Sequence, residues 1–475
     1  MNYALILIVV VLIMYKRTLN YGYCIDDFDV AKRSTGIKPK GTWEELYSSW
    51  QGIYYKQPRL GHRIVLLLQL ANTLMVYYAF GHNWISFLVA LLFTLHPAAT
   101  QTSVWLSGKG YATAIFFILL MYSFKWLSPL FYWAAFTWGG FSAAFASGIF
   151  LTSTFWPMIF LVPVMFLIKR KRISGALGHK WSITPAVTKK PSLKRIILFF
   201  KSIGYYTCLT LFPTRLGVYH DYLYTYGLSE EETKQWHKPD LFALLGLGVM
   251  SVTGYCLVTS WASPVTLGLL WFVLFIAQWC NFPTTLQQAI AERYLSLPLI
   301  GAMYALVNII YLIPDEAHFI TWGVFLKPIL LTAFVVGFAV RLHLHITSYR
   351  NIHYQIDHNL ANFPDNYAIW TWKGQEEKNR GAFFTAIEAW FQGWKLRKTD
   401  FRLNNNIAVL LTQVGQIDQA MDFLKLAEEN IPKDQMEAGL AYIRGARNDI
   451  LEMKRKMDLE ARKNKSQIII PGGPR

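Results

Sequence analysis

Long apolar segments recur along this chain, and they constrain its fold more than any other feature of the sequence. An α-helix needs about 20 mainly apolar residues to cross a hydrocarbon layer of about 30 Å. With 53% hydrophobic and 16% charged residues among 475, the composition is also too apolar for an ordinary soluble protein. We therefore predict an all-α fold with a polytopic membrane domain. Its eleven expected spans are residues 3–22, 62–80, 84–101, 111–127, 129–146, 150–168, 196–212, 241–260, 264–280, 296–313 and 322–340.

A basic segment indicates how these spans are oriented. Residues 169–201 contain ten Lys or Arg residues and no Asp or Glu. Under the positive-inside rule, a loop of this kind lies in the cytoplasm. Counting spans outward from it places the N-terminus in the cytoplasm and residues 23–61 across the membrane, in the ER lumen or the periplasm. Loops 213–239 and 281–295 and everything after the last span are then also extracytoplasmic.

The expected extracytoplasmic surface collects charged residues that apolar spans do not need. An acidic cluster, Asp26, Asp27 and Asp29, follows the first apolar segment in a chain whose formal net charge is +17. Basic residues at the outer ends of several spans break the positive-inside rule on this surface. Such a group is suited to an anionic ligand, for example a lipid-linked phosphate. The candidate ligands are Arg59, Arg63, His96, Lys109 and Arg215.

This combination of charges predicts glycosyl transfer from a polyprenyl-phosphate sugar. Asp26 or Asp27 would act as general base on an acceptor hydroxyl, and the cations would stabilise the phosphate leaving group. The alternative interpretation of the acidic cluster is a solvated loop end.

The C-terminal part of the chain has a 34-residue internal repeat. Gly381 and Ala386 match Gly415 and Ala420. Small residues at fixed positions let antiparallel helices approach closely, and this spacing is typical of tetratricopeptide (TPR) units. A generic pair of helical hairpins is the alternative. The predicted organisation is a membrane domain at 1–342, a TPR domain at 343–463 with units at 367–400 and 401–434 and a capping helix at 434–463, and a flexible tail at 464–475.

Three segments of the sequence resemble a known family. "MYKRTLNYGYCIDDFDVA", "FTLHPAATQTSVWLSGKGYATA" and "IAERYLSLPLIG" are similar, in this order, to motifs of the transmembrane and TPR-containing O-mannosyltransferases, which belong to the GT-C class. The resemblance implies a GT-C-like membrane domain and aligns Asp26 and Asp27 with the family's acidic pair. It also implies that Glu292, Arg293 and Tyr294 shape the donor phosphate or sugar site.

The sequence departs from this family at several positions. Lys109 stands where the family usually has Arg, and Gln101 stands where it usually has Glu. A histidine that is usual in the second apolar segment is absent, and the repeat array is shorter than in typical members. His96, by contrast, aligns with the family's His-Pro pair. Because Lys lacks the planar fork with which Arg holds phosphate at two points, donor binding is expected to differ.

The sequence therefore predicts an integral-membrane, hexosyl- or mannosyltransferase-like enzyme with an extracytoplasmic acceptor, most simply a protein hydroxyl. Polyprenyl phosphate, other membrane lipids and a protein bound by the TPR domain are the implied partners, and nucleic acid is not one of them. The alternative is a catalytically inactive scaffold of the same fold whose TPR domain docks a partner complex. A transporter is disfavoured because the sequence has no convincing inverted repeat and its ionisable residues gather at one face.

Two further expectations concern cofactors and the "ERY" segment, residues 292–294. The four cysteines lack metal-ligand spacing, so the sequence predicts neither a zinc site nor a disulfide framework. The sugar donor is a substrate, and a divalent cation is left open as a cofactor. Glu292 and Arg293 have a second interpretation, a purely structural salt bridge.

Overall fold

The computed structural model describes residues 2–24, 27, 58–135, 195–223, 238–282, 288–315, 322–431 and 436–467. Within these ranges the chain forms seventeen α-helices and no β-strand, which confirms the predicted all-α fold. The helices are α1 (Tyr3–Tyr15), α4 (Pro58–Ala79), α5 (Trp84–Leu95), α6 (Thr100–Ser103), α7 (Lys109–Ser123), α8 (Ser128–Ala134), α11 (Ile196–Leu211), α12 (Leu241–Thr259), α13 (Pro264–Ala277), α14 (Pro298–Tyr311), α15 (Trp322–Ser348), α16 (Ile352–Asn362), α17 (Tyr367–Asn379), α18 (Phe383–Leu396), α19 (Phe401–Gln413), α20 (Ile417–Glu429) and α21 (Met436–Gln467). Short 3₁₀ helices that bear on the site are η1 (Lys16–Asn20), η2 (Pro97–Ala99), η3 (Leu106–Gly108) and η8 (Glu292–Tyr294).

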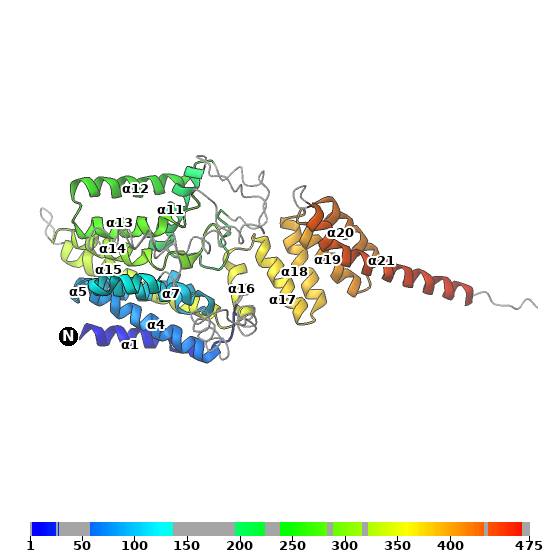
Figure 1. The fold of residues 1–475 in the computed structure, drawn as a ribbon, viewed down its shortest axis with the longest axis horizontal. Helices are drawn as coiled ribbons and strands as arrows, with labels where there is room; N and C mark the ends of the chain where they lie inside the picture. The colour runs from blue at the N-terminus through cyan, green and yellow to red at the C-terminus, as the bar shows by residue number, and fades with distance from the viewer. Residues whose placement is uncertain are drawn as a thin grey trace, which may run out of the picture. The chain divides into compact units, whose positions relative to one another are not determined.

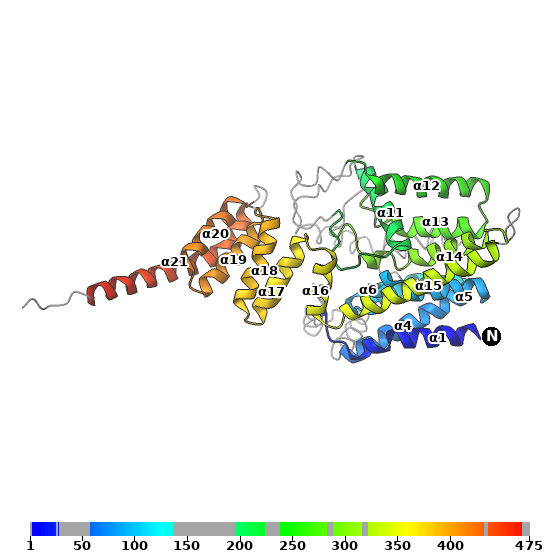
Figure 2. The same ribbon diagram turned by 180° about the vertical axis from the view of Figure 1, so that it is seen from behind.

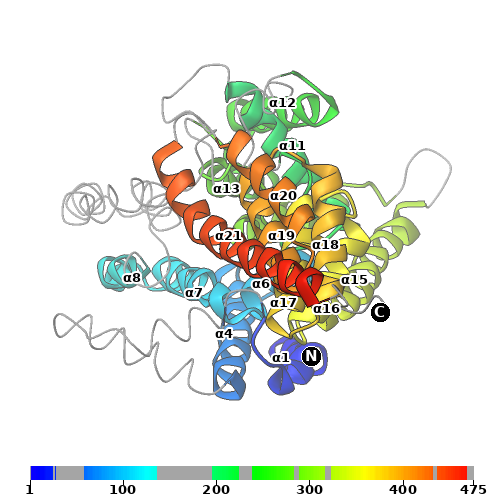
Figure 3. The ribbon, with the colours of Figure 1, turned by 90° about the vertical axis from the view of Figure 1, so that its right-hand side faces the viewer.

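The chain divides into two compact units, Met1–Asn362 and Phe363–Arg475. The sequence predicted a boundary after residue 342, and the structure instead includes α16 in the first unit. Asn359 of α16 explains this division, because its side-chain oxygen accepts a hydrogen bond of 2.8 Å from the Val218 N–H. In the first unit, α1 and α12 lie at opposite edges (Figures 1 and 3). The helices α5, α14 and α15 lie between them in Figure 1.

Several helices of the first unit are long and apolar enough to cross a membrane. Five single helical segments meet this description, and a bent helix pair raises the number to six within the described residues. The five are Tyr3–Asn20, Pro58–Ala79, Leu106–Ser123, Leu241–Thr259 and Val324–Ser348, and the pair is Trp84–Leu95 with Pro97–Ser103.

The prediction of eleven spans was therefore wrong for the described part of the chain. Three of the expected spans are the shorter apolar helices Ile196–Leu211, Pro264–Ala277 and Pro298–Tyr311. At 1.5 Å per residue these helices are about 21–24 Å long, which is less than the hydrocarbon thickness of about 30 Å. The expected span 150–168 and most of 129–146 lie outside the described residues.

The helix pair α5 and α6 is bent by 61° at a proline. His96 precedes Pro97 and adopts an extended conformation (φ −68°, ψ 120°), because a residue before proline is sterically excluded from the helical region. All four residues of α6 are buried although they are polar. Their hydroxyls donate to carbonyls of the preceding turn, as between Ser103 Oγ and the Ala99 oxygen at 2.9 Å.

The second unit is built from two helix pairs and a long final helix. The helices α17 and α19 begin 34 residues apart, and so do α18 and α20. Each pair turns at a glycine with positive φ, Gly381 (+80°) and Gly415 (+81°), a conformation that glycine adopts without strain. Inside the first pair, the indole of Trp390 packs on Gly374, where a Cβ would lie 2.2 Å from the ring. The helix α21 adds buried isoleucines to this core.

Candidate functional site

Buried polar side chains of the first unit gather near the ends of several helices. The C-terminal end of α1, the N-terminal end of α4 and the helix α16 lie at the same end of the unit, away from the N-terminus (Figures 1 and 2). Two groups of these residues contain members of the predicted site. We call them the Asp27 cluster, which contains Cys24, Asp27, Ser107 and Lys109, and the Glu292 cluster, which contains Gln101, Tyr205, Gly217, His220, Glu292, Arg293, His345 and His358.

The Asp27 cluster fixes one member of the predicted acidic pair. Asp27 is fully buried. Its Oδ1 accepts hydrogen bonds from the Ser107 N–H at 2.9 Å and the Ser107 hydroxyl at 2.7 Å, and its Oδ2 accepts one from the Cys24 N–H at 3.1 Å. The buried ammonium of Lys109 interacts electrostatically with this carboxylate. The other member, Asp26, lies outside the described residues.

A glycine brings the Asp27 cluster against α6. Gly108 ends η3, between Ser107 and Lys109, and a Cβ at this position would lie 1.9 Å from the carbonyl oxygen of Gln101. Only glycine permits this approach, because the obstructing atom belongs to the backbone and cannot move aside. The Asp27 cluster and Gln101 of the Glu292 cluster are therefore neighbours.

The Glu292 cluster is organised around one buried carboxylate. Oε1 of Glu292 accepts a hydrogen bond from the Gly217 N–H and lies 3.4 Å from His220 Nε2, and Oε2 lies 3.0 Å from His345 Nε2. Burial alone would raise the pKa of Glu292, but His345 and His220 lower it to about 2. Glu292 is thus ionised near neutral pH. Its partners are two histidines and a backbone amide, not Arg293, so the structural salt bridge between Glu292 and Arg293 does not form.

The histidines extend this contact into a chain of five side chains from five parts of the unit. On one side, His220 Nδ1 lies 2.9 Å from the hydroxyl of Tyr205. On the other side, His345 Nδ1 lies 3.1 Å from His358 Nε2. Burial and the neighbouring His345 lower the pKa of His358 to about 4, so His358 is neutral near neutral pH.

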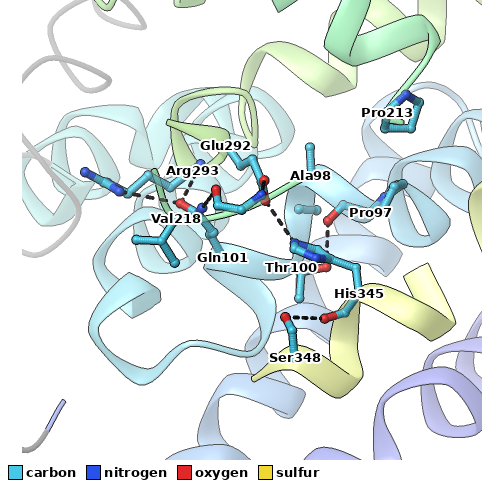
Figure 4. A network of polar contacts seen from close by, with 12 residues as sticks. Pro97, Ala98, Thr100, Gln101, Pro213, Val218, Glu292, Arg293, His345 and Ser348 are labelled. Atoms are coloured by element: carbon cyan, nitrogen blue, oxygen red, sulfur yellow. Dashed lines mark hydrogen bonds and ion pairs between the residues drawn. The ribbon is translucent and has the colours of Figure 1, made fainter. Parts of the chain in front are cut away.

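Gln101 joins Glu292's neighbourhood to Arg293. Its Nε2 donates to the Gly217 carbonyl at 3.1 Å, while its Oε1 accepts from the backbone N–H of Arg293 at 3.2 Å and from the guanidinium at 3.5 Å (Figure 4). The peptide groups of Gly217 are therefore held from both sides, the N–H by Glu292 and the C=O by Gln101. An amide performs this function because it is a donor and an acceptor at once.

Arg293 is a half-buried cation with neutral neighbours. Its guanidinium donates to the side-chain oxygen of Gln288 and to the Tyr294 hydroxyl, and it lies 4.9 Å from the Tyr294 ring centroid and 5.7 Å from that of Trp105. With Tyr294 and Trp279 it lines a cavity of about 20 Å³, enough for about one water. Within the described ranges, no ion pair joins Arg293 to a carboxylate.

The structure assigns different surroundings to the remaining predicted ligands. Arg59 and Arg63 are exposed on the first turns of α4, and Arg215 is exposed in the loop after α11. These three residues are not among the contacts of Arg293. Tyr294 lies beside Arg293, where its ring stacks on Trp279 with centroids 4.2 Å apart. Lys109 belongs to the Asp27 cluster.

His96 has a structural role at the bend between α5 and α6. Its Nδ1 accepts a hydrogen bond from the Ala98 N–H at 3.2 Å, so its other ring nitrogen must carry the proton. That nitrogen lies 2.9 Å from the Thr210 carbonyl, to which it donates. Both polar atoms of this buried side chain are thereby satisfied, and neither is available to a ligand.

Sequence reasoning missed the histidines that hold Glu292. His220, His345 and His358 come from three segments that no local motif connects. A signal for one of them was present, because His345 lies in an apolar helix long enough to span a membrane, and ionisable residues in such helices usually have a function. Ser107 was also missed, since a serine in a loop carries no comparable signal.

Comparisons with known proteins identify no relative, since no protein-family model, curated protein or solved structure matches this chain. The described ranges also contain no group of three or more His, Cys, Asp or Glu side chains arranged to hold a metal ion. The interpretation of the site therefore depends on its own geometry.

Proposed function

We propose that the first unit is a membrane-embedded glycosyltransferase that binds a polyprenyl-phosphate sugar, with Arg293 as the cation that receives the phosphate. The observation that carries the proposal is the surroundings of Arg293. A half-buried guanidinium with no carboxylate partner among the described residues is unfavourable in the free protein, and an anionic ligand would remove this penalty. Planar guanidinium groups also bind phosphate oxygens at two points.

Gln101 supports this assignment because its side chain is uncharged. A carboxylate at this position would neutralise Arg293 from within the protein, whereas the amide of Gln101 only hydrogen-bonds to it. The aromatic rings of Trp105, Trp279 and Tyr294 around the guanidinium exclude water on several sides. An electrostatic contact with phosphate is stronger in such surroundings than in water. A lipid-linked donor would reach Arg293 from the lipid that surrounds the apolar helices of the same unit.

The acceptor side of the reaction is assigned to the start of the acidic segment. The acceptor hydroxyl would attack the anomeric carbon of the sugar, the bond from that carbon to the phosphate oxygen would break, and a carboxylate would take the hydroxyl proton. Asp27 is poorly suited to this role because it is buried and already accepts four hydrogen bonds from Cys24 and Ser107. We therefore assign the base to Asp26.

The finer architecture also belongs to this proposal. A GT-C-like domain with the predicted orientation would present both clusters on the extracytoplasmic side. The helix pairs of the second unit, offset by 34 residues and closed by Gly381 and Gly415, support two TPR units that bind an acceptor protein or a partner.

The test is a transfer assay with purified protein, defined polyprenyl-phosphate sugars and mass spectrometry of the product. We expect transfer by the wild type, loss of transfer in Arg293→Gln and Asp26→Asn, and unchanged transfer in Arg444→Gln, which removes an exposed cation of α21. No transfer with any donor in a folded protein would contradict the proposal, and so would full activity of Arg293→Gln.

A second candidate function is the inactive scaffold, and the state of Asp27 favours it. An acidic residue of the predicted pair that is fully engaged in structural hydrogen bonds suggests a retained fold without catalysis. A scaffold would copurify with a stoichiometric partner, would lose it when the second unit is removed, and would show no transfer. Transfer activity of the isolated chain would exclude this alternative.

A further inference from the structure

Two of the predicted phosphate ligands, Arg59 and Arg63, have no described contact with Arg293, so their charge needs another explanation. They lie in the first two turns of α4, both are exposed, and no described carboxylate forms an ion pair with either. Leu67 follows at the same four-residue interval and is 64% exposed. Side chains at this spacing share one face of a helix, so the outward face of α4 passes from cations to an apolar side chain within about one turn.

The outward face of α1 has the same pattern in the opposite chain direction. Leu5, Val9 and Ile13 are exposed at four-residue intervals, so they form an apolar stripe along one face. Lys16 follows at the next turn, is exposed, and has no ion-pair partner among the described residues. An apolar stripe that ends in a cation is expected where a lipid-facing helix reaches the headgroup layer.

The helix α15 repeats this arrangement beside α1. Val336, Val340 and Leu344 are exposed at four-residue intervals, and His343 is exposed next to them. Arg17 of η1 reaches the same end of α15, because its guanidinium donates to the backbone carbonyl of His343 and lies 3.3 Å from the ring nitrogen Nε2. The two helices therefore place their polar ends together.

Backbone contacts join these helix ends into one group. The Gly22 carbonyl, just after η1, lies 3.3 Å from Nε2 of His62 on α4, and the Gly22 N–H donates at 3.4 Å to the carbonyl of Arg350, just after α15. The C-terminal end of α1 and the N-terminal end of α4 lie at the same end of the unit in both views (Figures 1 and 2). We call the cations of this end the basic rim: Lys16, Arg17, Arg59, Arg63 and Arg350.

We infer that the basic rim binds anionic phospholipids, with its cations on the headgroup phosphates and the apolar stripes of α1, α4 and α15 on the acyl chains. Each Lys or Arg near an anionic membrane surface strengthens binding about fivefold. In the predicted orientation these cations oppose the positive-inside rule, and an anionic lipid partner supplies a use for them. The inference rests on the membrane-embedded first unit of the proposed function, but it involves neither Arg293 nor sugar transfer.

The test is native mass spectrometry of full-length protein released from micelles that contain equal amounts of phosphatidylglycerol and phosphatidylcholine. We expect the wild type to retain phosphatidylglycerol in preference. The test variant combines Lys16→Gln, Arg59→Gln and Arg63→Gln, and its preference should fall by about tenfold or more. Because the three side chains are exposed, its unfolding midpoint in phosphatidylcholine should equal that of the wild type.

A matched control removes the same charge from three exposed positions of the second unit. It combines Lys395→Gln, Arg444→Gln and Arg455→Gln, and it should keep the full preference for phosphatidylglycerol. A third sample contains glycerol phosphate, which carries the same headgroup chemistry without acyl chains and should not displace the lipid.

Three results would overturn the inference. Equal retention of the two lipids by the wild type would show cations that only extend to the membrane surface without selecting its charge. A preference that persists in the rim variant would assign the lipid to another surface, and displacement by glycerol phosphate would indicate a site for a free anion. Retention of neither lipid would contradict the membrane-embedded unit as well. A rim that selects phosphatidylglycerol in a protein without transfer activity would leave this inference standing and refute the enzymatic function alone.

Discussion

Gly204 of α11 and Gly246 of α12 meet so closely that a Cβ on either would lie 1.9 Å from a backbone carbonyl oxygen of the other helix, that of Phe242 or Phe200. Backbone atoms on both sides leave no flexible group to move aside. The contact allows two apolar helices to pack without intervening side chains, as small residues do in membrane helix pairs.

We expect Gly204→Val to separate these helices and to destabilise the protein by about 1–3 kcal/mol, the usual cost of overpacking. Thermal unfolding in detergent measures the change. Gly248→Ala on the partner helix α12 is the control, since nothing lies within 4 Å of a Cβ there. Equal midpoints for wild type and Gly204→Val would contradict the close crossing.

In the second unit, two glycine substitutions should have opposite effects. Gly374→Ala directs a methyl group into the indole of Trp390, 2.2 Å away, and should destabilise the unit by about 1–3 kcal/mol. Gly445→Ala, at an open position of the helix α21, should instead stabilise it by up to about 1 kcal/mol, because alanine favours a helix interior. Chemical denaturation followed by tryptophan fluorescence reports both, and a stabilising Gly374→Ala would refute the packing.

Asp27→Asn tests the hydrogen bonds that fix the acidic segment. The new amide has one acceptor oxygen, so either the Ser107 groups or the Cys24 N–H must face a donor. Leaving a buried donor unsatisfied costs about 1–3 kcal/mol. We expect a lower unfolding midpoint, with a smaller loss in Ser107→Ala, which removes one donor but leaves the backbone bonds. Unchanged stability in Asp27→Asn would mean that the carboxylate is not engaged.

Acid should destabilise the first unit in two successive ranges of pH. Burial lowers the pKa of His358 from 6.5 to about 4, so the fold favours its neutral form and loses stability as pH falls from about 6.5 to 4. The pKa of Glu292 is lowered from 4.5 to about 2, so a further loss follows as pH falls through that interval.

Unfolding midpoints measured across this pH range test the assignment. His358→Gln should reduce the upper phase, to which the other buried histidines of the unit also contribute, and leave the lower one, and His353→Gln should keep both. If stability instead increased as the pH falls from 6.5 to 4, the assignment of a neutral His358 would be contradicted.

The sequence allowed the all-α fold and the apolar helices to be predicted because periodicity and length are local properties. The number of spans was not predictable, since the run that begins near Pro298 is apolar throughout while its helix ends at Tyr311. Glu292 and Arg293 were identified through their motif. That their side chains point to different partners was not predicted. The direction of each side chain depends on His345 and Gln101, which lie far away in the sequence.

The bend at Pro97 has a consequence for biogenesis. Beyond it, α6 consists of four buried polar residues, Thr100 to Ser103, which surrounding helices enclose. The newly made segment formed by α5 and α6 is therefore apolar only in its first half. Transfer of its polar second half into lipid alone would be unfavourable. The segment must therefore be accommodated together with helices that are made later, α11 and α15, whose residues complete its surroundings. Insertion of the first unit into a membrane would thus be a cooperative event rather than a sequence of independent insertions.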